Sequence, residues 1–188
     1  MALVDSPLGL ATTVLVYLLG LLISLAAGRR LRLPKGRTLL LYVWHSFFCV
    51  LYAVYALTNG ADALVYYAKA AQGEFVWSVG TGAVVSIATL FVAGLQLSFL
   101  GACLLFNIFG TIGLLAFDAT LRTVTANKSA LVRRLATVIA FLPSISFWSA
   151  ALGKDSLAFM ATGLVLWSAM DMKRRTLLMA GAIGVMML

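Results

Sequence analysis

Long apolar runs, separated by short clusters of lysine and arginine, constrain this chain more than any other feature. Hydrophobic residues make up 63% of its 188 residues and charged residues only 11%. Several runs approach the ~20 residues that a helix needs to cross the apolar core of a bilayer. The runs are continuous rather than alternating, which excludes the strands of a membrane barrel. The sequence therefore predicts an all-α, polytopic transmembrane helix bundle, formed by a single integral-membrane domain over residues 1–188.

The positions of the basic clusters decide how the apolar runs are divided. The run Ala83–Phe117 has 35 residues and would be about 50 Å long as one helix, against a core of about 30 Å. Two crossings there would put the basic stretch 122–134 on the opposite face from the basic loop 29–37, contrary to the positive-inside rule. We therefore expect an interfacial or re-entrant helix at about 83–95. The expected full spans cover about 8–27, 38–57, 97–117, 135–152 and 156–172, followed by a partial sixth span at 176–188.

The same charge distribution predicts the orientation. On this topology 12 of the 14 lysines and arginines face one side, and only Lys69 and Lys154 face the other. This bias predicts a multi-pass protein with its N-terminus outside. The net charge of +8 thus reflects bilayer orientation rather than a nucleic-acid partner. Only 13 residues follow Arg175, too few to cross comfortably, so we expect the sequence to be an incomplete copy of a longer protein.

Asp62 is the first residue with candidate chemistry. It lies in an expected polar loop just after the second span, shortly before Tyr66 and Tyr67. A carboxylate at that depth, flanked by phenols, is suited to act as a general base or to bind a sugar or a metal. The alternative is that Asp62 caps a surface helix, with the two tyrosines as anchors at the membrane interface.

The turn Gly153-Lys154-Asp155-Ser156 is the second candidate site, because it places a lysine beside an aspartate between two expected spans. Lys154 could pair with the phosphate of a lipid-linked donor while Asp155 orients that donor. The same cavity is expected to be lined by Ser146 and Trp148, from a span that Pro143 kinks. Because Asp62 and Lys154 fall on one face of the expected topology, we expect them to share an outward cleft.

A purely structural interpretation of this turn is equally consistent with the sequence. Gly153 can end one helix in a left-handed cap, and Asp155 or Ser156 can cap the next helix. A tight hairpin between two spans requires such residues.

The remaining polar residues of the apolar runs are mostly expected to join helices. His45 lies in the middle of the second span, where a lone histidine is either a functional site or a hydrogen-bond partner of a neighbouring helix. Asn107 and Gln96 are expected to form interhelical hydrogen bonds, and Gly101, Gly110 and Gly113 to let helices approach closely. Cys49 and Cys103 are expected to act as small hydrophobic residues. No metalloprotease, nucleophile-elbow, P-loop or dinucleotide motif is present, so the sequence indicates no metal site and leaves any cofactor unknown.

Three segments together carry a resemblance to a known class of proteins. They read GADALVYY at 60–67, FNIFGTIGLL at 106–115 and LPSISFWSAALGKDSL at 142–157. In this order they resemble bacterial polysaccharide-assembly membrane proteins, which are similar to GT-C-type lipid-linked glycosyltransferases and EpsG/Wzy-like polysaccharide polymerases. The resemblance implies polyprenyl-phosphate-linked sugars as substrate, with Asp62 at the catalytic acidic position. It also implies that Lys154 and Asp155 lie in the substrate cavity.

Two functions are therefore expected. The first is a membrane glycosyltransferase or polysaccharide polymerase that acts on polyprenyl-phosphate-linked sugars at the outer face of the bacterial inner membrane, as the resemblance implies. In this function Asp62 deprotonates or orients the acceptor hydroxyl, and Lys154 binds the substrate and stabilises the departing phosphate. The other expected substrate-binding residues are Asp155, Tyr66, Tyr67, Trp148 and Ser146. The alternative is a non-catalytic membrane subunit, a transporter or an assembly partner, that works with other membrane subunits.

Overall fold

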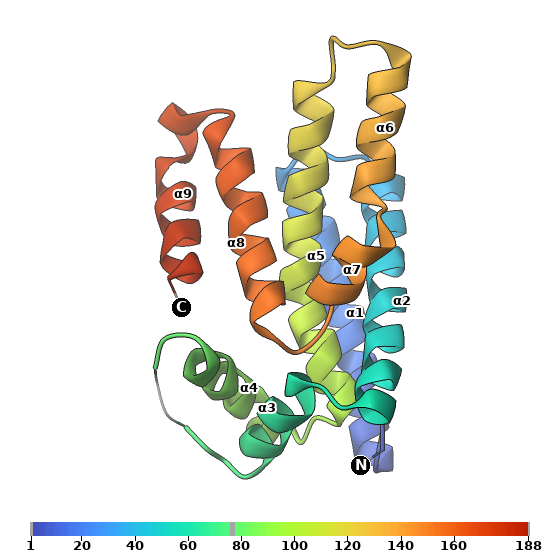
Figure 1. Ribbon diagram of the computed structural model, residues 1–188, viewed down its shortest axis with the longest axis vertical. Coiled ribbons are helices and arrows are strands. Elements are labelled where there is room, and N and C mark those ends of the chain that lie inside the picture. The colour runs from blue at the N-terminus through green and yellow to red at the C-terminus, as the bar shows by residue number, and fades with distance from the viewer. Residues whose placement is uncertain (1, 76–77, 188) are drawn as a thin grey trace.

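The computed structural model describes residues 2–75 and 78–187, and this part of the chain contains helices but no strands (Figure 1). This confirms the all-α prediction. In chain order the helices are α1 (Pro7–Arg30), α2 (Lys35–Asn59), α3 (Asp62–Ala71), α4 (Thr81–Leu95), α5 (Phe99–Val124), α6 (Ala130–Ala140), α7 (Pro143–Ser149), α8 (Lys154–Ala169) and α9 (Met172–Met186).

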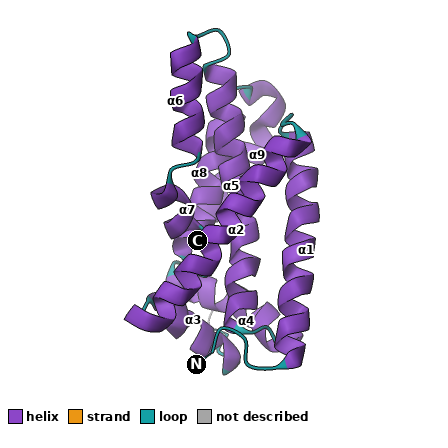
Figure 2. Ribbon diagram, turned by 90° about the vertical axis from the view of Figure 1, so that its right-hand side faces the viewer, coloured by secondary structure: helices purple, strands orange, loops and turns teal. Residues whose placement is uncertain are grey.

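Helix α5 forms the centre of the bundle. It packs lengthwise against α1, α2 and α8, while α6 and α7 cover another part of it (Figures 1 and 2). Most of its side chains are buried, whereas α1 exposes a series of leucines and other apolar residues along its length. That contrast is typical of a membrane bundle, in which the outer helices face lipid and one helix is enclosed by protein.

Small residues allow α5 to contact its neighbours closely. A Cβ atom on Gly113 would lie 2.7 Å from the carbonyl oxygen of Phe159 in α8, and one on Gly163 of α8 would meet the carbonyl oxygen of Gly113. A Cβ atom on Gly110 would likewise meet the carbonyl oxygen of Ser149 at the end of α7. The expected role of Gly110 and Gly113 in close helix approach is thus confirmed.

Four segments are long and apolar enough to cross a membrane: α1, α2, α5 and the combined stretch Ala130–Ser149. The last one is broken into α6 and α7 just before Pro143, where we expected only a kink. Proline cannot donate the backbone hydrogen bond that would continue α6, and it is well placed in the first turn of α7. The expected fifth and sixth spans correspond to α8 and α9. These have 16 and 15 residues and are about 24 and 23 Å long.

The region before α5 contains one confirmed prediction and one error. A short helix was expected at 83–95, and it is present as α4, which ends at Gln96 in a left-handed conformation (φ 49°) and so is separate from α5. The expected polar loop after α2 is instead the helix α3, which agrees with the alternative of a surface helix that begins at Asp62. Its buried residues Ala63, Tyr66, Tyr67 and Ala70 follow helical spacing, and this apolar face packs against α4.

The two ends of the bundle differ in charge as the sequence predicted. The end of α1, the start of α6 and the start of α9 lie at one end, and with them Arg30, Arg133 and Arg174 (Figure 1). The starts of α3 and α8, with Asp62 and Lys154, lie toward the other end. Because α4 is a short helix separate from α5, both basic regions lie at the same end of the bundle.

We expect Gly113→Ala to destabilise the bundle by about 1–3 kcal/mol, because the added methyl group must displace the backbone of α8. Thermal unfolding of the detergent-solubilised protein measures the change. Gly181→Ala in α9 is the matched control, since no atom lies within 4 Å of the added carbon, and it should leave stability unchanged or slightly raised. Equal stability of the two variants would contradict the close contact between α5 and α8.

The arrangement of the ends predicts which positions share a side of the membrane. Both native cysteines are fully buried, so new cysteines report on their own positions. In sealed vesicles, a membrane-impermeant maleimide should label Asp62→Cys and Lys154→Cys from the same side. Lys128→Cys should be labelled only from the opposite side. Labelling of all three from one side would show that the stretch before α5 crosses the membrane.

Candidate functional site

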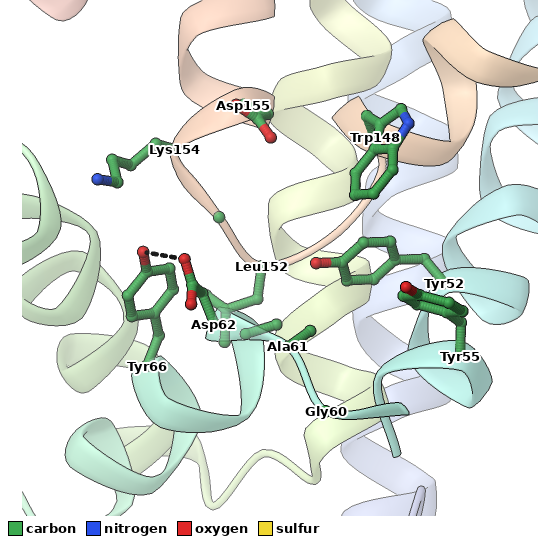
Figure 3. A pocket seen from close by; sticks show the side chains of 12 residues that line it. Tyr52, Tyr55, Gly60, Ala61, Asp62, Tyr66, Trp148, Leu152, Lys154 and Asp155 are labelled. Atoms are coloured by element: carbon green, nitrogen blue, oxygen red, sulfur yellow. Dashed lines mark hydrogen bonds between the residues drawn. The ribbon is translucent and has the colours of Figure 1, made fainter. Parts of the chain in front are cut away.

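A cavity of about 360 Å³ lies between the end of α2, the start of α3, α7 and the loop that leads into α8 (Figure 3). It brings together five residues that the sequence singled out: Asp62, Tyr66, Trp148, Lys154 and Asp155. The expected cleft shared by Asp62 and Lys154 is therefore present. The other lining residues are Tyr52, Tyr55, Gly60, Ala61, Ala63, Leu152 and Gly153.

Asp62 is the first residue of α3 and is exposed to this cavity. The residue at the N-cap is Ala61, and no side chain caps the helix, so the interpretation of Asp62 as a cap is wrong. The hydroxyl of Tyr66, one turn later, donates to Asp62 Oδ2 over 3.5 Å. This long bond orients the carboxylate while leaving it accessible from the cavity.

Lys154 and Asp155 are the first two residues of α8, and both are exposed. The capping interpretation is wrong here too. Gly153 has an extended backbone (φ 175°) and lies at the N-cap of α8 without any side-chain cap, while the preceding helix already ends at Ser149. Ser156 donates to the carbonyl oxygen of Gly153 and does not cap the helix. Among the described residues, neither Lys154 nor Asp155 forms an ion pair.

Lys154 also lines a second, mainly apolar cavity of about 160 Å³. This apolar groove lies between α4, α8 and α9 and is lined by Gly80, Ala83, Val84, Leu157, Ala158, Val185 and Met186. In Figure 3 the Lys154 ammonium group points away from Trp148 and Asp155. The lysine is therefore placed at the junction between a polar cavity and an apolar groove.

An aromatic wall forms the side of the polar cavity opposite Lys154 (Figure 3). Tyr52 contacts Trp148 edge-on, with ring centroids 6.2 Å apart, and Tyr55 contacts Phe147 in the same manner at 5.6 Å. Trp148 remains 55% exposed, so its ring is available to a ligand. Sequence reasoning missed Tyr52 and Tyr55. Their spacing of three residues, near the end of an apolar helix that precedes Asp62, was the available signal.

Two predicted site residues do not line the cavity. Tyr67 is packed against Phe99, and its hydroxyl donates to the carbonyl oxygen of Leu97, while burial raises the pKa of its phenol. Ser146 is fully buried on the other face of α7. The helical turn of α7 directs Trp148 to the cavity and Ser146 to the interior, so the expectation that both line it is wrong for Ser146.

A buried polar cluster joins α2, α5 and α7 in the interior. His45 Nδ1 lies 2.6 Å from Asn107 Oδ1, and its Nε2 lies 3.1 Å from Ser149 Oγ. The amide of Asn107 also donates to Ser46 Oγ. The expected interhelical role of Asn107 is confirmed, whereas Gln96 is exposed at the end of α4 and does not join helices. His45 is fully buried and acts here as an interhelical hydrogen-bond partner.

No protein-family model, curated protein or solved structure matches this chain. The lining of the polar cavity carries two carboxylates and one ammonium group beside an aromatic wall. Such a set can accept hydrogen bonds from several hydroxyl groups, stack against a sugar ring and pair with one phosphate.

Because Lys154 and Asp155 cap nothing, we expect Lys154→Gln and Asp155→Asn each to change the free energy of unfolding by at most about 0.5 kcal/mol. Thermal or denaturant unfolding in detergent checks this. As a contrast, Asn107→Leu should cost about 1–3 kcal/mol, since it leaves His45 Nδ1 buried without its closest partner. A large loss of stability in Lys154→Gln would restore the structural interpretation of the turn.

Proposed function

We propose that this chain is a membrane glycosyltransferase or polysaccharide polymerase, or part of one, that acts on polyprenyl-phosphate-linked sugars. The observation that supports it best is the position of Lys154 between the polar cavity and the apolar groove. A lipid-linked sugar has the same sequence of parts: an apolar chain, a phosphate and a polar head. In the proposed complex the chain occupies the groove, the phosphate pairs with Lys154, and the sugar enters the polar cavity.

The charges of the cavity favour this orientation of the substrate. Asp62 and Asp155 would repel a phosphate placed among them, but their oxygens are good acceptors for sugar hydroxyl groups. Lys154 points toward the groove side, so a phosphate paired with it stays away from the carboxylates. The rings of Tyr52 and Trp148 then offer an apolar surface to the sugar face.

In the proposed reaction, the oxygen of the acceptor hydroxyl attacks the anomeric carbon of the donor, and Asp62 accepts the proton of that hydroxyl. The bond between that carbon and the phosphate oxygen breaks, and polyprenyl phosphate leaves with the electron pair. Lys154 stabilises the negative charge that develops on the leaving phosphate. Tyr66 orients the base through its hydrogen bond to Asp62.

The proposal also covers the membrane topology. We propose five full spans, formed by α1, α2, α5, the α6–α7 pair and α8, with α9 as a partial sixth. The N-terminus and the cavity then lie on the outer side of a bacterial inner membrane. In support, the arginine-rich segments gather at the opposite end of the bundle, as the positive-inside rule requires of a cytoplasmic face.

The test uses purified protein in lipid nanodiscs with a polyprenyl-phosphate-linked monosaccharide and a sugar acceptor. We expect Asp62→Asn to lower the rate of sugar transfer by about 100-fold or more, the usual contribution of a general base. Lys154→Arg should raise the KM for the donor about tenfold, because a larger planar group replaces a compact ammonium. The matched control is Lys69→Gln combined with Glu74→Gln, which removes a half-exposed ion pair of 3.4 Å outside the cavity and should leave transfer unchanged.

Binding measurements separate the parts of the substrate. Fluorescence of Trp148, with Trp148→Phe to identify its contribution, should respond to the complete lipid-linked sugar at lower concentration than to the polyprenol or the sugar phosphate alone. Binding without transfer would favour the alternative, a non-catalytic membrane subunit that carries the lipid-linked sugar. Failure of all three probes to bind would refute the proposal.

A further inference from the structure

Another cavity, of about 480 Å³, is lined by residues of the α1–α2 loop, the end of α5 and the turn between α8 and α9. These segments lie at the opposite end of the bundle from the start of α3 (Figure 1). Three arginines from three separate segments line the cavity: Arg32 from the α1–α2 loop, Arg122 from the end of α5 and Arg175 from the start of α9. They face one carboxylate, that of Asp171. The net positive charge of this arginine cavity favours an anionic ligand.

The loop that carries Arg32 is anchored. Leu31 and Leu33 are both buried in a cluster with Leu114, Leu115 and Trp167, so the backbone between them has little freedom. Arg32 itself has a φ of 59°, a left-handed conformation that is unfavourable for a residue with a Cβ atom. A glycine would adopt this conformation without that cost. Arg32 therefore occupies this position at a conformational cost.

Arg175 is held equally firmly. Its guanidinium carbon lies 4.0 Å from the ring centroid of Trp167, and one of its nitrogens donates to the carbonyl oxygen of Trp167 over 2.6 Å. The backbone of Arg175 departs from helical geometry inside α9 (φ −122°, ψ 19°). This contact uses only some of its five N–H donors. The backbone is thus distorted at two of the three arginines of the cavity.

Arg32 and Arg122 have no such partners. Across residues 2–75 and 78–187, their guanidinium groups form neither an ion pair nor a hydrogen bond with a protein group, whereas Arg37 nearby is fully paired with the buried Asp118. Arginine guanidinium groups recognise phosphate through paired, parallel hydrogen bonds.

We propose that the arginine cavity binds the phosphate of an anionic phospholipid from the leaflet at this end of the bundle. Basic pockets between membrane helices on the positively charged side are suited to such headgroups. The lining supports a lipid, since Leu31, Met170 and Trp167 give it an apolar part beside the arginines. This site is independent of the sugar cavity and of the reaction proposed there.

Native mass spectrometry of the purified protein, titrated with phosphatidylglycerol or phosphatidylcholine, tests the proposal. We expect the wild type to prefer phosphatidylglycerol, and Arg32→Gln combined with Arg122→Gln to weaken its binding about tenfold. The matched control is Arg30→Gln combined with Arg174→Gln. It removes the same charge from arginines at the same end that are exposed, as Arg32 and Arg122 are, but that do not line the cavity. It should weaken binding less than twofold. Equal losses in the two double variants would show that only general surface charge attracts the lipid.

A second titration uses inorganic phosphate and pyrophosphate as ligands in place of the phospholipids. If either binds with the same dependence on Arg32 and Arg122 while phosphatidylglycerol is not preferred, the lipid assignment is overturned in favour of a soluble phosphate.

Arg32→Gly separates binding from folding. It relieves the left-handed conformation, so we expect a higher unfolding temperature together with weaker binding of phosphatidylglycerol. A residue with a purely structural role would not show these opposite changes. Unaltered lipid binding in this folded variant would contradict the proposal.

Discussion

Close backbone contact along α5 is the constraint on which the rest of the bundle depends. Helices that share a lipid environment gain little from hydrophobic burial against each other, so they associate through close packing and interhelical hydrogen bonds. Helix α5 provides both, with Gly110 and Gly113 against α7 and α8 and with Asn107 bonded to His45 and Ser46 of α2. At its far end, the buried Asp118 pairs with Arg37. The outer helices are therefore placed by their contacts with α5.

The candidate sugar site follows from this packing. Because Gly110 admits the backbone of Ser149, α7 ends against α5, and the segment 150–152 that follows is buried although it is not helical. Such a segment is tolerated within a membrane protein only where protein encloses it. It delivers Lys154 and Asp155, at the start of α8, beside the end of α2 and the start of α3. The cavity is thus formed by the ends of helices whose middle parts are fixed by α5.

The sequence was most informative where a single physical rule applied. The positive-inside rule predicted that the run before Phe117 contains a short helix separate from the following span, and the structure contains α4 and α5 as two separate helices. The shared position of Asp62 and Lys154 followed from the same topology. The orientation of residues within a helix was less predictable: Ser146 and Trp148 are two residues apart in a short helix after a break, and only the structure shows which one faces the cavity. The sequence left open whether the residues after Asp62 form a polar loop or a surface helix, because the buried face of α3 includes two tyrosines whose hydroxyl groups weaken its apolar pattern.

The two proposed phosphate sites differ in a way that suits their roles. A lysine is a compact, mobile charge that can stabilise a phosphate which must depart, whereas arginines bind phosphate through several directed hydrogen bonds. The sugar cavity contains one lysine, and the cavity at the opposite end contains three arginines. Helix α8 connects the two, since Lys154 begins it and Trp167, on which Arg175 stacks, lies near its end. One helix packed along α5 thus contributes to both cavities, while the charged groups that would meet phosphate come from different residues at its two ends.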